Sequence, residues 1–251
     1  MLELIEPNQD YLPPINEEEL SDEKVLEEIK SLKNKLGNEV VVLGHHYQQD
    51  DIVQFADYTG DSLALAKIAA KVDSPNVIFC GVHFMAETAD MLTSKNQKVI
   101  LPDLKAGCSM ADMANSDQIE KAWRHLTQTT DEKIIPVTYI NCSAELKAFV
   151  GKNGGSICTS SNAKQIIEWA LKQGDKLLFF PDQHLGRNTC FDMGIPLEKM
   201  VTYDPNMYGG GLKNTEIQNS KVILWHGFCS VHQGFTVSQI KNVKKDSPET
   251  T

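Results

Sequence analysis

The stretch that decides the fold is Lys133-Ile-Ile-Pro-Val-Thr-Tyr-Ile140, an almost continuous apolar run. Five further runs of this kind occur along the chain, at 39–43, 76–82, 98–101, 176–180 and 221–225. A strand with one face in water alternates apolar and polar residues, whereas an unbroken run indicates a strand that is covered on both faces. We therefore expect the buried strands of parallel sheets.

Helical patterns separate these runs. They lie near 50–71, 85–92, 118–126, 144–149, 163–173 and 236–244. An acidic helix is expected from about Glu18 to Leu36, capped by Asn16 or Ser21, after an irregular lead at 11–14. Strands that alternate with helices are typical of α/β proteins with right-handed βαβ crossovers. The sequence thus predicts Rossmann-like α/β domains with parallel sheets.

Composition excludes several classes of protein. The 251 residues carry a net charge of −10, and the first 30 of them hold ten acidic and two basic residues. Scattered Lys and Arg disfavour nucleic acid as a partner, because phosphate binding needs a basic face. No apolar run approaches the roughly 20 residues of a membrane span, and the acidic start differs from a signal peptide. The expected location is the cytoplasm, or the plastid stroma for a plastid-encoded protein.

The six cysteines lie far apart and form no C-x-x-C pair; they are Cys80, Cys108, Cys142, Cys158, Cys190 and Cys229. Reduced core thiols are the simplest interpretation of most of them. Cys108, between Gly107 and Ser109, and Cys229, just after an apolar run, are better placed as thiolate ligands. His232 follows Cys229 by three residues, but widely separated cysteines suit a cluster better than a zinc finger.

Ligands of parallel α/β proteins gather at the carboxyl ends of strands. Gly44-His45-His46-Tyr47-Gln48 follows the first run and offers imidazole and phenol groups for proton transfer, although a surface or capping histidine pair is the alternative. Tyr139 and Asn141 end another run, on the same face. Two helix starts, at Gly60-Asp61-Ser62 and 158–162, offer N–H groups and hydroxyls to a carboxylate or phosphate, while an ordinary N-cap explains Asp61 and Ser62 equally well.

These segments resemble the quinolinate synthase family, the iron–sulfur enzymes of de novo NAD biosynthesis. The matching stretches run in family order from about residue 38 to 245: Gly44–Gln48, Gly60–Leu63, Phe79–Ala89, Leu101–Ser109, Tyr139–Asn141, Thr159–Ala163, Pro181–Arg187 and His226–His232. The resemblance implies three similar α/β domains around a pseudo-threefold axis, each giving one cysteine to a 4Fe-4S cluster. Cys108 and Cys229 fall on the first two ligand positions, and the third ligand is absent from this chain.

The domain boundaries expected on this basis are an acidic lead and helix at 1–37, a first α/β domain at 38–125, a second at 126–220, and the start of a third at 221–251. A return of the chain into the first domain near 190–220 is left open. The last run and its helix are followed by no strand, which is the pattern of a truncated domain. In the family, the third domain continues with a strand ending in His-Pro-Glu and with the third cysteine.

The reaction implied by the resemblance is condensation of iminoaspartate with dihydroxyacetone phosphate to quinolinate, with loss of phosphate and two waters. The substrate contacts would be His45, Ser62, Tyr139, Asn141 and Ser160, with Tyr47 and His232 as acid–base or orienting groups. The cluster would act as a Lewis acid. An enzyme that oxidises L-aspartate is the expected pathway partner.

Two alternatives remain open from the sequence. The chain could be an inactive remnant that binds small dicarboxylates or phosphate esters, or a zinc-dependent hydrolase built on Cys108, Cys229 and His232. A bound cluster, a colourless protein that still binds anions, or stoichiometric zinc would distinguish the three.

Overall fold

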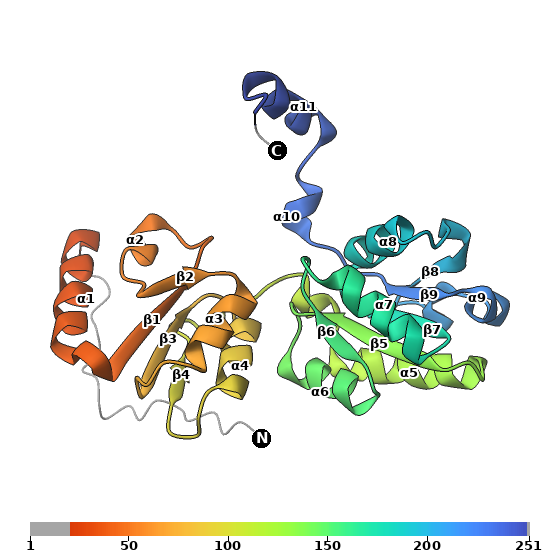
Figure 1. The fold of residues 1–251 in the computed structure, drawn as a ribbon, viewed down its shortest axis with the longest axis horizontal. Coiled ribbons are helices and arrows are strands. Elements are labelled where there is room, and N and C mark those ends of the chain that lie inside the picture. Colours follow the sequence, from red (N-terminus) through yellow and green to blue (C-terminus); the bar gives the residue numbers. More distant parts are fainter. Residues whose placement is uncertain (1–20, 250–251) are drawn as a thin grey trace.

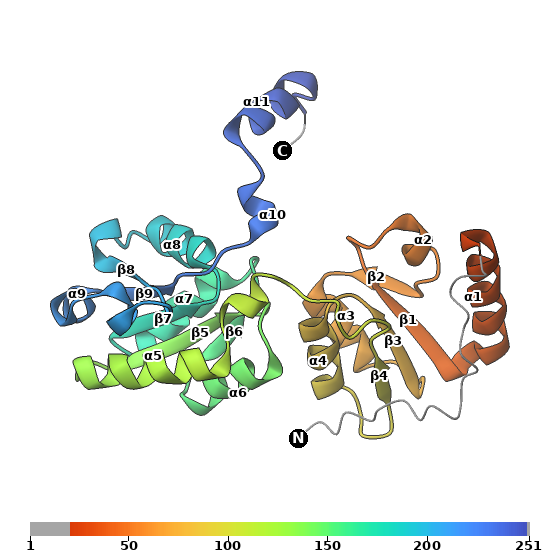
Figure 2. The ribbon, with the colours of Figure 1, turned by 180° about the vertical axis from the view of Figure 1, so that it is seen from behind.

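All strands of the computed structural model, which describes residues 21–249, pair in parallel and form two separate sheets. The two units that contain them lie side by side (Figure 1). The chain passes from one unit to the other through the segment between β4 and α5, which is visible from behind in Figure 2. The predicted α/β class with parallel sheets is confirmed.

The N-terminal unit contains α1 (Asp22–Leu36), β1 (Val40–His45), α2 (Asp50–Val53), β2 (Tyr58–Gly60), α3 (Ser62–Ala69), β3 (Asn76–Cys80), α4 (His83–Leu92) and β4 (Lys98–Ile100). Its strand order is β2-β1-β3-β4, with Val40 opposite Asn76 and Gly44 opposite Cys80. One face of the sheet forms a core with α3 and α4, in which Leu43, Leu65 and Phe79 are fully buried.

The C-terminal unit contains α5 (Ser116–Thr129), β5 (Ile134–Tyr139), α6 (Ala144–Lys152), β6 (Ser156–Cys158), α7 (Ala163–Gln173), β7 (Lys176–Phe180), α8 (Gln183–Asp192), β8 (Met200–Tyr203), α9 (Asn214–Asn219) and β9 (Val222–Trp225). Its strand order is β6-β5-β7-β9-β8. Alternate residues of each central strand enter different cores: Leu178 and Phe180 pack with α5, α6 and α9, and Leu177 and Phe179 pack with α7 and α8. Helices on both faces explain why these strands are apolar throughout.

The structure corrects three expected domain assignments. The run at 221–225 does not open a third domain, because β9 pairs with β7 and β8 inside the second sheet. Trp225 is fully buried there and stacks on Tyr203, with 5.9 Å between the ring centroids. The segment 190–220 likewise stays in the C-terminal unit and does not re-enter the first. α5, expected in the first domain, packs in the same core through Ile119 and Leu126.

The hydrophobic pattern does not predict three short strands. β2, β6 and β8 are three or four residues long and too short for a hydrophobic pattern, and β2 divides the expected helix at 50–71 into α2 and α3. α8, α9 and the short α10 (Ser230–Gln233) were also missed. The N-terminal helix is present as α1, with Ser21 in the N-cap position. The irregular lead at 11–14 and the possible cap Asn16 lie outside the described residues.

After β9 the chain leaves the C-terminal unit, and α10 and α11 (Val237–Asp246) project away from both units (Figure 1). α11 has no buried residue, and Val237, Ile240 and Val243 are exposed. Within residues 21–249, no third sheet is formed. None of the helices in this range is long and apolar enough to cross a membrane.

Two glycines near β6 provide a matched test of the close packing in the C-terminal unit. A Cβ on Gly155 would lie 1.8 Å from the carbonyl oxygen of Pro136 in β5, whereas a Cβ on Gly151 in α6 would meet nothing within 4 Å. Gly155→Ala should lower the free energy of unfolding by about 3 kcal/mol or more, because backbone must move. Gly151→Ala should raise it by about 0.5–1 kcal/mol. Equal urea midpoints for the two variants would contradict this packing.

Candidate active site

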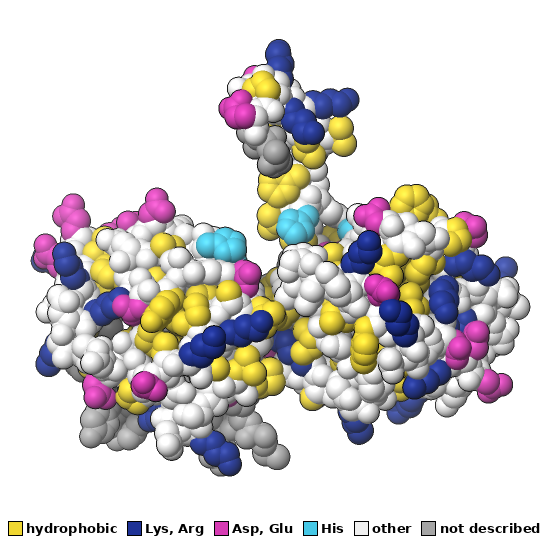
Figure 3. Space-filling view, viewed as in Figure 1, with side chains coloured by type: hydrophobic (Ala, Val, Ile, Leu, Met, Phe, Trp, Pro, Cys, Tyr) yellow, Lys and Arg dark blue, Asp and Glu magenta, His cyan; other side chains and the backbone are white. Residues whose placement is uncertain are grey.

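The strand ends of both units carry the polar residues singled out in the sequence. In the N-terminal unit, the end of β1 lies beside the end of β2, with His45 paired to Gly60 in the parallel ladder. In the C-terminal unit, Tyr139 at the end of β5 pairs with Cys158 at the end of β6. Histidine side chains gather where the two units and α10 meet (Figure 3).

The rings of His45, His46 and Tyr47 lie against one another at the end of β1, tilted by 36–37°. The ring centroids of His45 and Tyr47 are 4.0 Å apart, and those of His45 and His46 are 4.3 Å apart. The backbone N–H of Tyr47 donates to Nδ1 of His45 at 3.4 Å, so the ring proton of a neutral His45 lies on Nε2. Burial, followed by the positive charge of His46, lowers the pKa of His45 to about 4, although Asp61 acts in the opposite direction. His45 is therefore a neutral imidazole with a free N–H donor.

A pocket of about 360 Å³ opens between the two units. Its lining comes from the start of α3 and from the loops that follow β5 and β6: Asp61, Ser62, Leu63, Ala64, Lys67, Tyr139, Ile140, Asn141, Thr159, Ser160 and Ser161. Four of the five predicted substrate-binding residues, Ser62, Tyr139, Asn141 and Ser160, thus share one pocket. The fifth, His45, lies at the neighbouring strand end, close enough to Asp61 for their charges to interact.

Two helices begin at this pocket. Asp61 caps α3 by accepting a hydrogen bond from the N–H of Ala64 at 2.8 Å. At the start of α7, Asn162 Oδ1 accepts from the N–H of Thr159 at 2.6 Å, which leaves the hydroxyls of 159–161 at the pocket wall. Backbone N–H groups and hydroxyls at helix starts attract carboxylates and phosphates. Both helix starts are therefore suited to small anionic groups, and the pocket between them is called the anion pocket below.

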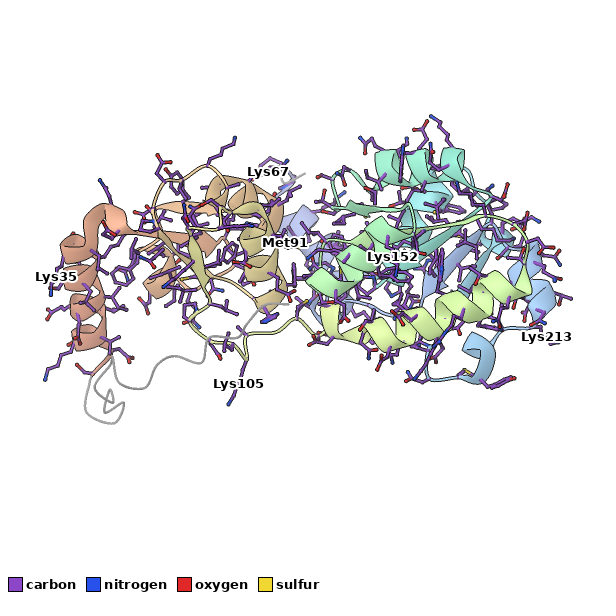
Figure 4. All side chains as sticks on the ribbon, turned by 90° about the horizontal axis from the view of Figure 1, so that it is seen from below. Lys35, Lys67, Met91, Lys105, Lys152 and Lys213 are labelled. Carbon is purple, nitrogen blue, oxygen red and sulfur yellow. The ribbon has the colours of Figure 1, made fainter. Side chains whose placement is uncertain are left out.

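Sequence reasoning missed Lys67, which supplies the one positive charge among the residues that line this pocket. It lies one helical turn after Leu63 on α3, and the spacing i, i+4 from a residue at the helix start could have revealed it. Figure 4 labels Lys67 on the edge of the N-terminal unit next to the C-terminal unit.

The loops of Cys108 and Cys229 are joined directly. The hydroxyls of Ser109 and Ser230, the residues that follow the two cysteines, are 3.1 Å apart. Trp225 Nε1 donates to the carbonyl oxygen of Met113 at 2.7 Å, which fixes the same two segments at a second point. Both thiols are half-buried and free. The two cysteines that the sequence favoured as ligands therefore lie on adjacent loops.

The phenols lie near one of these thiols. Burial raises the pKa of Tyr47, and the charge of Cys108 acts in the same direction. Burial, and to a lesser extent the charges of Asp182 and Cys108, also raises the pKa of Tyr139, whereas its hydrogen bond with Ser160 acts in the opposite direction. Both phenols are consequently protonated at neutral pH and can donate hydrogen bonds.

The other cysteines have different surroundings. Cys142, Cys158 and Cys190 are buried in the cores, and burial raises the pKa of each thiol, to about 12 for Cys158 and Cys190. Cys80 is half-buried, and burial raises its pKa as well. These four are neutral thiols, whereas metal ligands are thiolates.

The metal-binding groups do not form a complete site on their own. Residues 21–249 contain no group of three or more His, Cys, Asp or Glu side chains arranged to hold a metal ion. His232, on α10, is exposed, and nothing in the described part of the chain places it with the other candidate residues in a common metal site. His184, at the start of α8, is hydrogen-bonded through Nδ1 to Nη2 of Arg187 at 2.9 Å.

The lowered pKa of His45 predicts a pH-dependent stability. An unfolded histidine binds a proton near pH 6.5 and His45 in the folded chain only near pH 4, so the unfolded state binds more protons in between. The free energy of unfolding should fall by up to about 3 kcal/mol as the pH drops through this window. His45→Asn should remove that loss and His46→Asn part of it, as measured by urea unfolding at each pH. An unchanged pH slope in His45→Asn would refute the assignment.

Comparison with known proteins gives a consistent result. Residues 27–251 match the family model described as quinolinate synthetase A protein. The chain is 51% identical over 254 residues to a quinolinate synthase of Bacillus cereus (strain G9842) and 50% identical over 254 residues to that of Bacillus thuringiensis (strain Al Hakam). Each alignment covers 99% of this chain and 67% of the relative. The chain belongs to the quinolinate synthetase A family.

Proposed function

We propose that this chain takes part in the condensation of iminoaspartate with dihydroxyacetone phosphate to quinolinate, with release of phosphate and two waters. The observation that carries the proposal is the anion pocket between the two units, with helix starts, hydroxyls and phenols on its walls. Two relatives that are 51% and 50% identical to this chain are named quinolinate synthases. Both substrates are small and anionic, which suits the helix starts, the hydroxyls and Lys67. Iminoaspartate is labile, and an enzyme that oxidises L-aspartate would supply it.

The residues of the pocket have distinct roles in this proposal. Ser62 and the start of α3 hold one anionic group, while Ser160 and the start of α7 hold another. Asn141 orients a carbonyl or imine through its amide. His45 donates from Nε2, and Tyr47 and Tyr139 donate as phenols, so all three can stabilise negative charge that develops on substrate oxygens. His232, on α10, would be a further acid–base or orienting group.

Cys108 and Cys229 are the residues that would hold a 4Fe-4S cluster. Free thiols on two loops that a Ser109–Ser230 hydrogen bond joins are suitable donors, because thiolates are the ligands of such clusters. When bound, the cluster would supply Lewis-acid chemistry for the dehydration steps. Residues 21–249 offer no third thiol beside these two, so the third ligand of such a cluster would come from outside these residues.

Iron content tests the ligand assignment. After anaerobic reconstitution with iron, sulfide and a small thiol that supplies the third ligand, the wild-type chain should be brown and contain iron and sulfide, whereas Cys108→Ser and Cys229→Ser should each lose at least most of the iron. Cys80→Ser is the matched control, because this half-buried thiol lies outside the two loops and should leave iron unchanged. A full complement of iron in either loop variant would contradict the assignment. Stoichiometric zinc, or a colourless protein that still binds anions, would refute cluster chemistry.

Binding of dihydroxyacetone phosphate tests the pocket. Tyr139→Phe and Ser160→Ala should each weaken binding by about tenfold or more in calorimetric titrations, since hydrogen bonds to charged groups contribute about 1.5–3 kcal/mol. Tyr208→Phe is the matched control for the phenol, because Tyr208 is fully exposed and away from the pocket. Equal losses in Tyr139→Phe and Tyr208→Phe would argue against binding at this pocket.

A further inference from the structure

Lys147 of α6 is a buried lysine that the reaction does not use. The residue is 6% exposed, although lysine is usually among the most exposed residues. Nζ donates to the carbonyl oxygen of Cys142 at 2.8 Å and, in the other unit, to Thr88 Oγ1 at 2.9 Å and the carbonyl oxygen of Phe84 at 3.5 Å. An ammonium group has three donors, and all three are satisfied. It also lies 5.5 Å from the centre of the Phe84 ring.

Glu87 of α4 makes the reciprocal contact. Its Oε2 accepts a hydrogen bond from the N–H of Ala144, the first residue of α6, at 2.9 Å. Ser143 caps the same helix from its own unit by accepting from the N–H of Leu146 at 3.3 Å. A carboxylate at a helix start is favourable because it meets unsatisfied N–H groups. Thus the Glu87 carboxylate of α4 binds the start of α6, and the Lys147 ammonium of α6 binds α4.

These contacts are costly as a means of stabilising the protein. Burial lowers the pKa of Lys147, and the nearby carboxylate of Glu87 only partly opposes this effect. Apolar residues of similar size often pack as well as a buried charged pair or better. Fully bonded polar groups, in contrast, impose one fixed geometry, since any shift would leave a buried donor or acceptor unsatisfied.

The fixed geometry bears on the pocket. Lys147 holds the carbonyl of Cys142, which immediately follows the pocket residues Tyr139, Ile140 and Asn141. The opposite wall, with Ser62 and Lys67, belongs to the N-terminal unit. Because the two walls come from different units, the distance between them depends on how the units are held.

From these contacts we infer that Lys147 and Glu87 are positioning residues: they lock the 140–143 loop of the C-terminal unit onto α4 of the N-terminal unit and so set the spacing between the two walls of the anion pocket. The contacts themselves are independent of the ligand. The effect on substrate binding rests on the proposed function.

Amide hydrogen exchange tests the lock directly. Lys147→Met, which keeps the length and apolar stem, should speed exchange of segments 84–88 and 140–146 by about tenfold or more, while β5 and β7 stay protected. Lys152→Met is the matched control, because Lys152 lies on the same helix, is exposed, and is labelled in Figure 4. It should exchange like the wild type.

Two milder changes cover the case in which Lys147→Met does not fold. Thr88→Val removes one acceptor without changing the shape of the side chain, and should also speed exchange of 140–146. Glu87→Ala should expose the Ala144 amide, whereas Glu87→Gln, which keeps an oxygen acceptor, should preserve most of its protection. Exchange at the wild-type rate in Lys147→Met would overturn the inference. If Lys147→Met is unfolded, exchange at the wild-type rate in both Thr88→Val and Glu87→Ala would overturn it.

Binding of dihydroxyacetone phosphate tests the consequence for the pocket. Lys147→Met and Glu87→Ala should weaken binding by about tenfold or more, and Lys152→Met should not, although none of these residues lines the pocket. Faster exchange with unchanged affinity would refute the positioning role. If the wild-type chain itself fails to bind, the proposed function fails, while the exchange comparison still decides whether the lock exists.

Discussion

Parallel strand pairing is the constraint on which the rest of this structure depends. Parallel strands cannot be joined by tight hairpins, so each connection must cross over the sheet through a helix. Every strand then ends on the same edge, and the loops with His45, Ser62, Tyr139 and Ser160 are brought to two such edges. The chemistry of the site comes from loops, but its convergence comes from the hydrogen-bond pattern of the sheets.

The two units are also held together, and the pocket depends on how they are joined. The anion pocket takes one wall from each of them, so neither sheet alone could build it. Polar contacts cross the junction at Lys147, Glu87 and the Ser109–Ser230 pair. Polar contacts are directional, whereas apolar contacts tolerate small shifts. The polar contacts at the junction therefore fix the geometry of the pocket more strictly than apolar contacts between the two units could.

Much of the fold could be predicted because its central strands are covered on both faces and are therefore apolar throughout. Strands such as β5 and β7 follow from this pattern, and α7 follows from its amphipathic spacing. The apolar pattern does not predict which strands pair with each other, because an apolar run is equally suited to any sheet. For this reason β9 was assigned to a third domain, although Trp225 completes the core of the second unit. Short edge strands such as β2 leave too few residues for any pattern.

The candidate site divides in the same way. The sequence by itself determined which residue types follow the strand ends, because loop chemistry is local, and its motifs were specific enough to indicate the family. Tertiary structure alone decided that Ser62 and Ser160 face one pocket, that Lys67 lines it, and that Lys147 is buried between the units. The physical reason is that burial and convergence depend on contacts between residues far apart in the chain, and a single sequence does not encode those contacts in any local pattern.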